Sequence, residues 1–282
     1  MKTIGVIGAG VIGVGVAQSF AMYDYRIKLI DINQEKLNTV KKEITNNIRF
    51  MKFFQKMQIN KSIDEILSNI EISASYNEVE ECSFIIENID ENLEKKKEVY
   101  TKLDTICKSN CIYLVNTSCI PIHSIAELMT YPEHVIGVHF MNPVHIKDTV
   151  EVIKSKLTSE IVLDTVIKLL KSIQKEGVVV NDFPGFVSNR ASHLFMNEAA
   201  YIVQDKVASV ESVDIIFKKC FGHTMGPLET ADLIGIDTIV NSLLVLQENY
   251  GGSKFECCPL LLEMVKEGKL GRKTGMGFYQ YA

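Results

Sequence analysis

Three glycines near the start of the chain have the spacing of a phosphate-binding turn. Gly8, Gly10 and Gly13 form a G-x-G-x-x-G pattern between a strand-like run and a helix-like run. In such a turn the first glycine allows the sharp bend, the second lets the backbone approach a pyrophosphate, and the third permits close helix–strand packing. The backbone N–H groups of Val11 and Ile12 would face that pyrophosphate at the positive end of the helix dipole. The pattern predicts a dinucleotide site.

A carboxylate at the end of the second strand-like run indicates which dinucleotide binds. Asp31 follows Gly13 by 18 residues, close to the roughly 20-residue separation at which an acidic side chain accepts a hydrogen bond from a ribose 2′-hydroxyl. Its charge would repel a 2′-phosphate, and the next residues, Ile32 and Asn33, supply no cation. We therefore predict NAD rather than NADP.

A histidine and a glutamate on two later strand-like runs could do acid–base chemistry. His139 follows the apolar run 135–138, and Glu151 interrupts the apolar run 150–153. A carboxylate inside such a run is costly unless it has a partner. A His–Glu pair would orient the imidazole and favour its protonated form, as a general base for an alcohol proton requires. The spacing also allows a structural histidine and an edge-strand glutamate.

These residues lie in a segment where short β-rich runs alternate with helical stretches, the pattern of a mostly parallel sheet covered on both faces. The predicted strands cover 2–7, 26–30, 82–87, 111–115, 135–140, 150–153 and 177–181, and the predicted helices cover 11–22 and 35–58. We expect the strand ends to position the chemistry.

The pattern changes near Pro184 and Gly185, beyond which almost every stretch has helical periodicity. The clearest helices there cover 190–203, 210–220, 238–250 and 259–267. We therefore predict an α/β fold of two domains. Residues 1–182 would form a Rossmann-type, doubly wound, NAD-binding domain, and residues 183–282 an all-helical C-terminal domain.

Composition excludes several classes of protein. The 282 residues are 46% hydrophobic and 23% charged, as in ordinary globular proteins. A net charge of −5 does not provide the basic face that nucleic acids need. The seven cysteines and six histidines lack metal-site spacing, so we expect no metal. The uncharged segment 3–23 is rich in glycine and is predicted to be buried strand and helix, not a membrane span. We expect a cytoplasmic protein.

Several further motifs, in their order and spacing, resemble the 3-hydroxyacyl-CoA dehydrogenase family, which includes bacterial 3-hydroxybutyryl-CoA dehydrogenases. The resemblance covers essentially the whole chain. The motifs that carry it are GAGVIG at 8–13, ENL at 91–93, NTS at 116–118, HFMNP at 139–143, VEV at 150–152, PGF at 184–186, NR at 189–190, MGP at 225–227 and GRKTG at 271–275.

The resemblance implies a reversible oxidation of a 3-hydroxyacyl thioester to a 3-oxoacyl thioester, with NAD as hydride acceptor. His139 would be the general base and Glu151 its orienting partner. Ser118 and Asn189 would hydrogen-bond the C3 oxygen and the region of the thioester carbonyl. The residues implied to contact the nicotinamide half of NAD are Glu91, Lys96, Ser118, Asn142 and Lys273. Closure of the two domains would exclude water, and the family resemblance implies a homodimer formed through the helical domain.

Two departures from the family pattern leave the thioester carrier open. Residues 145–149 read HIKDT, where the CoA enzymes usually have Pro-Val-Met-Lys-Leu. Phe54 occupies the place of a lysine that meets the CoA 3′-phosphate, although Arg49, Lys52 and Lys56 lie nearby and could substitute. Alternatively, the phenylalanines of this helix are simply its core face.

With these departures, and with CFGH at 220–223 and LETAD at 228–232, the chain resembles a subgroup found in polyketide and peptide antibiotic pathways. Its members oxidise glyceryl or seryl groups held on an acyl carrier protein, on the route to hydroxymalonyl, methoxymalonyl or aminomalonyl extender units. The alternative is a 3-hydroxybutyryl-CoA or other 3-hydroxyacyl-CoA dehydrogenase of fatty-acid or butyrate metabolism. A third hypothesis, from another class, is a non-catalytic NAD-binding structural protein.

Overall fold

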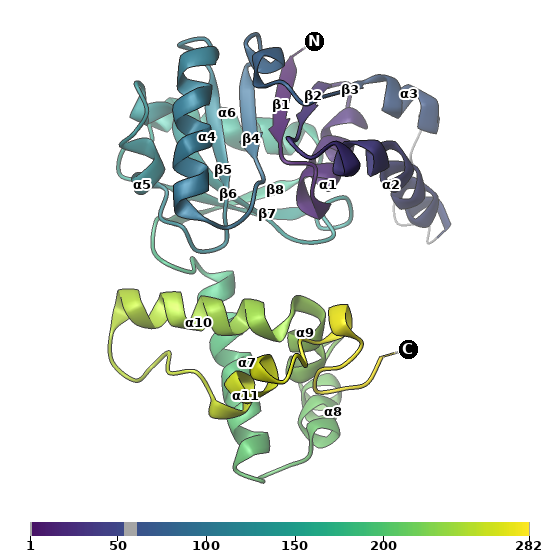
Figure 1. Ribbon diagram of the computed structural model, residues 1–282, viewed down its shortest axis with the longest axis vertical. Coiled ribbons are helices and arrows are strands. Elements are labelled where there is room, and N and C mark those ends of the chain that lie inside the picture. Colours follow the sequence, from purple (N-terminus) through teal and green to yellow (C-terminus); the bar gives the residue numbers. More distant parts are fainter. Residues whose placement is uncertain (1, 54–60, 282) are drawn as a thin grey trace. The chain divides into compact units, whose positions relative to one another are not determined.

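The computed structural model describes residues 2–53 and 61–281. They form two compact units, of which the first ends at Phe183 and the second begins at Pro184. Figure 1 shows strands with flanking helices in the first unit and helices in the second. In the described part of the chain, no helix has the length and apolar character that crossing a membrane requires.

The first unit is built on one eight-stranded sheet with the order β3-β2-β1-β4-β5-β6-β7-β8. The strands are β1 (Thr3–Ile7), β2 (Arg26–Ile30), β3 (Ile70–Ser73), β4 (Phe84–Glu87), β5 (Ile112–Asn116), β6 (Val135–Phe140), β7 (Thr149–Lys154) and β8 (Glu176–Asn181). Every neighbouring pair is parallel except β6 and β7, which are antiparallel. The chain order reverses between β1 and β4, and such a switch point is where open α/β sheets bind ligands. The predicted Rossmann-type sheet is confirmed.

Helices cover both faces of this sheet. They are α1 (Val11–Ala21), α2 (Gln34–Phe53), α3 (Ile63–Ser68), α4 (Leu93–Ile106), α5 (His123–Ala126) and α6 (Glu160–Ser172), with short 3₁₀ turns η1 (Tyr76–Val79) and η2 (Pro132–His134). Leu114 of β5 belongs to the core that α1, α2 and α6 share with the strands. The adjacent Tyr113 instead packs its ring against Tyr100 of α4, at 6.2 Å between centroids. Because successive strand residues point to opposite faces, α4 lies on the other side.

The second unit is helical, as predicted. Its helices are α7 (Ser188–Gln204), α8 (Val210–Cys220), α9 (Pro227–Ile234), α10 (Ile236–Tyr250) and α11 (Pro259–Lys266), followed by a short turn, η3 (Arg272–Thr274). Apolar side chains of α7, α9, α10 and α11 form its main core. The buried carboxylate of Asp232 accepts the backbone N–H groups of Phe278 and Tyr279, both at 2.9 Å, and so fixes the C-terminal segment to α9.

Candidate functional site

The glycine turn after β1 leaves the N-terminus of α1 open. Gly8 has φ +96°, and a Cβ there would lie 2.7 Å from the carbonyl oxygen of Asn88. A Cβ on Gly13 would lie 1.8 Å from the carbonyl oxygen of Gly8, whereas one on Gly10 would meet nothing within 4 Å. Gly10 is the N-cap of α1, and no side chain caps the helix. The first-turn N–H groups are therefore available to a phosphate.

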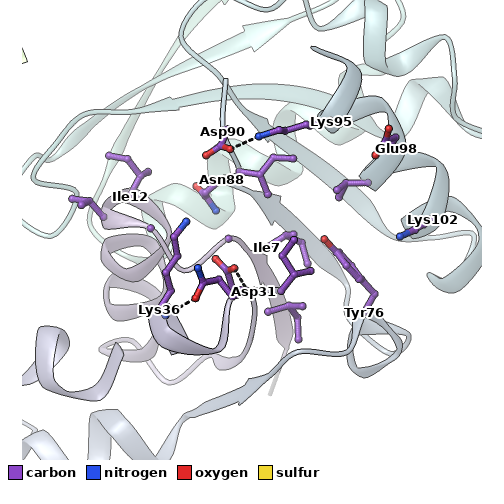
Figure 2. Close-up of a pocket in the computed structure, with 18 residues that line it drawn as sticks. Ile7, Ile12, Asp31, Lys36, Tyr76, Asn88, Asp90, Lys95, Glu98 and Lys102 are labelled. Carbon is purple, nitrogen blue, oxygen red and sulfur yellow. Dashed lines mark hydrogen bonds and ion pairs between the residues drawn. The ribbon is translucent and has the colours of Figure 1, made fainter. Parts of the chain in front are cut away.

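A cavity of about 600 Å³ opens beside this turn, within the size range of ligand sites. Figure 2 shows its walls, which come from the ends of β1 and β2, from α1 and α2, and from η1, the loop after β4 and α4. Asp31 lies at its edge: its Oδ2 accepts the N–H of Ala9 at 2.7 Å, and its Oδ1 accepts the N–H of Asn33 at 2.8 Å. Apolar walls, a fixed carboxylate and open helix N–H groups fit the adenosine and pyrophosphate parts of NAD.

Neutralising Asp31 is expected to narrow the preference for NAD. An Asp31→Asn variant keeps the size of the side chain but loses the charge and one of the two acceptor oxygens. Hydrogen bonds to charged groups contribute about 1.5–3 kcal/mol. We expect NADH to bind roughly 10-fold more weakly and the ratio of the NADPH and NADH dissociation constants to fall. Fluorescence titration measures both constants. Glu98→Gln, at another carboxylate of the cavity wall, is the control, and an unchanged ratio in Asp31→Asn would mean that Asp31 does not meet the ribose.

His139 and Glu151 lie directly opposite each other on the antiparallel strands β6 and β7. Their side chains join through a hydrogen bond of 2.9 Å between Nδ1 of His139 and Oε2 of Glu151, and both residues are 8% exposed. A carboxylate that accepts from Nδ1 leaves the lone pair on Nε2. That nitrogen lies 3.3 Å from Oγ of Ser118. The three side chains thus form a chain of hydrogen bonds that can take up or deliver a proton.

Glu91 fixes the loop that carries Ser118. One of its carboxylate oxygens accepts from Oγ1 of Thr117 at 2.6 Å and from the backbone N–H groups of Ser118 and Cys119 at 2.8 and 2.9 Å. These contacts hold the Ser118 hydroxyl opposite His139. The expected contact of Glu91 with the nicotinamide half stays a prediction.

Lys96 does not present its ammonium to the cavity. Lys96 and Glu87 are both 0% exposed, and Nζ of Lys96 lies 2.8 Å from each carboxylate oxygen of Glu87 and 2.9 Å from the carbonyl oxygen of Asn116. Burial raises the pKa of the Glu87 carboxyl, and the Lys96 ammonium opposes that effect. All three protons of the ammonium are donated to these acceptors. In this arrangement Lys96 therefore has no proton left for the expected hydrogen bond to NAD. Lys96 instead joins the ends of β4 and β5.

Two asparagines missed by the sequence analysis extend this network. The Asn116 amide donates to Oδ1 of Asn88 at 3.0 Å, and its Oδ1 accepts the backbone N–H of Phe140 at 3.2 Å. The contacts tie the ends of β4, β5 and β6 together beside His139. A signal was present in the sequence: Glu87 ends an apolar strand-like run as Glu151 interrupts one, and a carboxylate in either place needs a partner when it is buried.

The three remaining predicted site residues are Asn142, Asn189 and Lys273. Asn142 is exposed, precedes Pro143 through a cis peptide bond, and lines a second cavity of about 430 Å³ with residues of α1 and α2. Asn189 lies in the first turn of α7, and Lys273 lies in η3, where its Nζ pairs with Asp237 at 2.5 and 2.6 Å. Both belong to the second unit, and their expected contacts stay predictions.

Among the described residues, no group of three or more His, Cys, Asp or Glu side chains could hold a metal ion.

Lys175 holds the loop that follows Asn142. Its Nζ donates to the carbonyl oxygens of Val144 and Lys147 at 2.6 and 2.5 Å, so it fixes the segment in which HIKDT replaces the usual family sequence. Burial lowers the pKa of the Lys175 ammonium to about 8. It also lowers the pKa of His145 in the same loop, and the charge of Lys175 adds to that effect.

The stability of the protein should therefore rise with pH relative to a Lys175→Met variant. Between about pH 8 and about pH 10.5 the unfolded chain keeps a proton on Lys175 that the folded chain has released, and stability rises with pH wherever the unfolded state binds more protons. Urea denaturation of both proteins across this window measures the difference. Lys171→Met, at an exposed position, is the control. Parallel pH curves for wild type and Lys175→Met would contradict the prediction.

Comparisons with known proteins cover nearly the whole chain. Residues 3–183 match the model of the 3-hydroxyacyl-CoA dehydrogenase NAD binding domain, and residues 185–281 match that of the C-terminal domain. The chain is 40% identical to a probable 3-hydroxybutyryl-CoA dehydrogenase of Bacillus subtilis, over 100% of this chain and 98% of the relative. It is 39% identical to the 3-hydroxybutyryl-CoA dehydrogenase of Clostridioides difficile, over 99% of both. The crystal structure of (S)-3-hydroxybutyryl-CoA dehydrogenase from Ralstonia eutropha superposes with a TM-score of 0.94 at 32% identity, over 100% of this chain and 99% of that one.

Proposed function

The chain belongs to the 3-hydroxyacyl-CoA dehydrogenase family, and we propose that it interconverts short-chain 3-hydroxyacyl-CoA and 3-oxoacyl-CoA thioesters, of which 3-hydroxybutyryl-CoA is the best example. The observation that carries the proposal is the hydrogen-bonded chain Ser118–His139–Glu151 at the end of a nucleotide-binding sheet. NAD is the cofactor, and the names of relatives that span the whole chain support a short acyl group.

The geometry gives each of these side chains a role. When bound, NAD supplies the nicotinamide ring that accepts the hydride from C3 or returns it. His139 takes the hydroxyl proton on Nε2, and Glu151 stabilises the imidazolium that forms. The Ser118 hydroxyl, 3.3 Å from Nε2, donates to the C3 oxygen where negative charge gathers in the reduction direction. Asn189 supplies a second donor to the thioester in this proposal, and the second unit also provides the surface for a homodimer.

The CoA thioester replaces the carrier-protein substrate that the departures favoured. Relatives named as CoA dehydrogenases match the full length of the chain at up to 40% identity. Phe54 and Lys56, two of the residues that bear on the choice of carrier, lie outside the described residues. The HIKDT loop remains a difference from the family, but its described anchor, Lys175, binds its backbone carbonyls and does not distinguish the two carriers.

Three acetoacetyl thioesters test the proposal: those of CoA, of pantetheine and of an acyl carrier protein. NADH consumption is followed for each at matched concentrations. We expect kcat/KM for the CoA ester to exceed that for the carrier-bound ester by at least roughly 10-fold, about 1.4 kcal/mol. A higher kcat/KM for the carrier-bound ester would mean that the substrate is held on an acyl carrier protein. Binding of NADH without turnover of any thioester would indicate a non-catalytic NAD-binding protein.

A further inference from the structure

Three lysines of the described residues line the dinucleotide cavity: Lys36, Lys95 and Lys102. Two of them have partners on the cavity wall. Lys95 forms an ion pair with Asp90 at 2.7 Å, and the Lys102 ammonium lies 5.8 Å from the centre of the Tyr76 ring. The ammonium of Lys36 forms no ion pair or hydrogen bond with the described residues, so it is available to a ligand.

Lys36 lies in the first turn of α2, just after the carboxylate that selects the cofactor. Asn33, at the start of the helix, accepts the backbone N–H of Lys36 with its side-chain oxygen at 3.2 Å, which fixes the position of its Cα. Figure 2 shows the side chain reaching along the cavity beside Asp31, with its ammonium on the side of Asn88 and Asp90. Lys95 holds the pKa of Asp90 below its ordinary value, and Lys36 contributes to the same shift. The ammonium therefore lies within the cavity.

Asp31 and Lys36 differ in how firmly they are held. Both carboxylate oxygens of Asp31 accept backbone N–H groups, and the residue is 9% exposed, so its charge cannot move away from the ribose. Lys36 has a flexible four-carbon side chain, and its ammonium has no ion pair or hydrogen bond with the described residues that would have to break before it moves. A 2′-phosphate, which carries about −1.5 to −2 charges, would therefore meet a fixed anion and a movable cation.

We propose that Lys36 is a specificity-determining residue for the dinucleotide and a latent ligand for a 2′-phosphate. The preference for NAD is then set by the balance of Asp31 against Lys36, not by Asp31 alone. Ile32 and Asn33 supply no cation, but the first turn of α2 does. Once the charge of Asp31 is removed, Lys36 recruits NADP. This proposal rests on one part of the proposed function, the binding of a dinucleotide in this cavity, and does not depend on the thioester substrate.

The test measures binding, so a failure of thioester turnover would leave it unaffected. NADH and NADPH are titrated by their own fluorescence into wild type, Lys36→Met, Asp31→Asn and the double variant, with Lys102→Met as a matched lysine control in the same cavity. We expect Asp31→Asn to lower the Kd for NADPH itself by about 10-fold or more, in addition to raising the Kd for NADH. Adding Lys36→Met should reverse that gain, and Lys36→Met alone should change the Kd for NADH by less than about 3-fold. Binding of NADH by each variant shows that the cavity has formed.

Two results would overturn the proposal. If the double variant binds NADPH as tightly as Asp31→Asn, Lys36 does not meet the 2′-phosphate. If Lys36→Met weakens NADH and NADPH equally, Lys36 contacts the pyrophosphate that both cofactors share. A gain in NADPH affinity that disappears in Lys36→Met backgrounds and survives in Lys102→Met would support it. The gain should also weaken at high ionic strength, because an exposed phosphate–ammonium pair is screened by salt.

Discussion

Replacing His139 with glutamine is expected to lower kcat for acetoacetyl-CoA reduction by at least about 100-fold, within the range for general acid–base catalysis. Glutamine has a polar side chain of similar length but cannot exchange a proton at the position of Nε2. The Kd for NADH should change by less than about 2-fold, because His139 lies on β6 and does not line the dinucleotide cavity. Steady-state kinetics and fluorescence titration measure the two quantities.

A histidine elsewhere in the same unit provides the control. His134→Gln changes a residue of η2 and should leave kcat unchanged. Glu151→Gln should reproduce most of the loss, because the amide cannot stabilise the imidazolium as the carboxylate does across its 2.9 Å hydrogen bond. Turnover by His139→Gln near the wild-type rate would remove the dyad from the mechanism.

Replacing Lys96 with methionine is expected to lower the free energy of unfolding by about 3–5 kcal/mol, the usual cost of leaving one partner of a buried ion pair without the other. Glu87 is 0% exposed, and its carboxylate would lose a partner at 2.8 Å to each oxygen. Urea denaturation measures the change. The double variant Glu87→Gln/Lys96→Met should recover part of the stability because no uncompensated charge remains.

The neighbouring Lys95 separates this effect from a general loss of charge on α4. Its side chain is 58% exposed, and Lys95→Met should change stability by less than about 0.5 kcal/mol. A direct cofactor contact by Lys96 would give a different result: stability near that of wild type and a Kd for NADH raised by 10-fold or more. That outcome would contradict the structural role described above.

The dinucleotide turn was predictable because its chemistry is local. Gly8, Gly10 and Gly13 act through backbone conformation and close approach, which their spacing alone specifies. The His139–Glu151 contact depended on strand direction, which the sequence does not reveal. β7 runs antiparallel to β6, and only this register places the two residues opposite each other. β3 was missed because it is a four-residue edge strand.

The positions of Lys96 and Lys36 follow from helical geometry, which shows the direction in which each side chain points. Lys96 lies in a charged run that is typical of a solvated helix face. Yet it precedes Tyr100 and Leu103 by four and seven residues, and all three are 0% exposed. Helical periodicity therefore placed it on the buried face of α4. Lys36 follows Asp31 by five residues, and it reaches the same cavity only because α2 begins directly after the strand end.

The destination of the hydride tests the central claim most directly. The protein is incubated with acetoacetyl-CoA and NADH deuterated at the transferable position, in separate reactions for its two faces, and the product is analysed by mass spectrometry. We predict 3-hydroxybutyryl-CoA with one deuterium at C3 from one of the two cofactors, and unlabelled product from the other. NADH that binds without forming this product, or product without deuterium at C3 from either cofactor, would contradict the assignment as a 3-hydroxyacyl-CoA dehydrogenase.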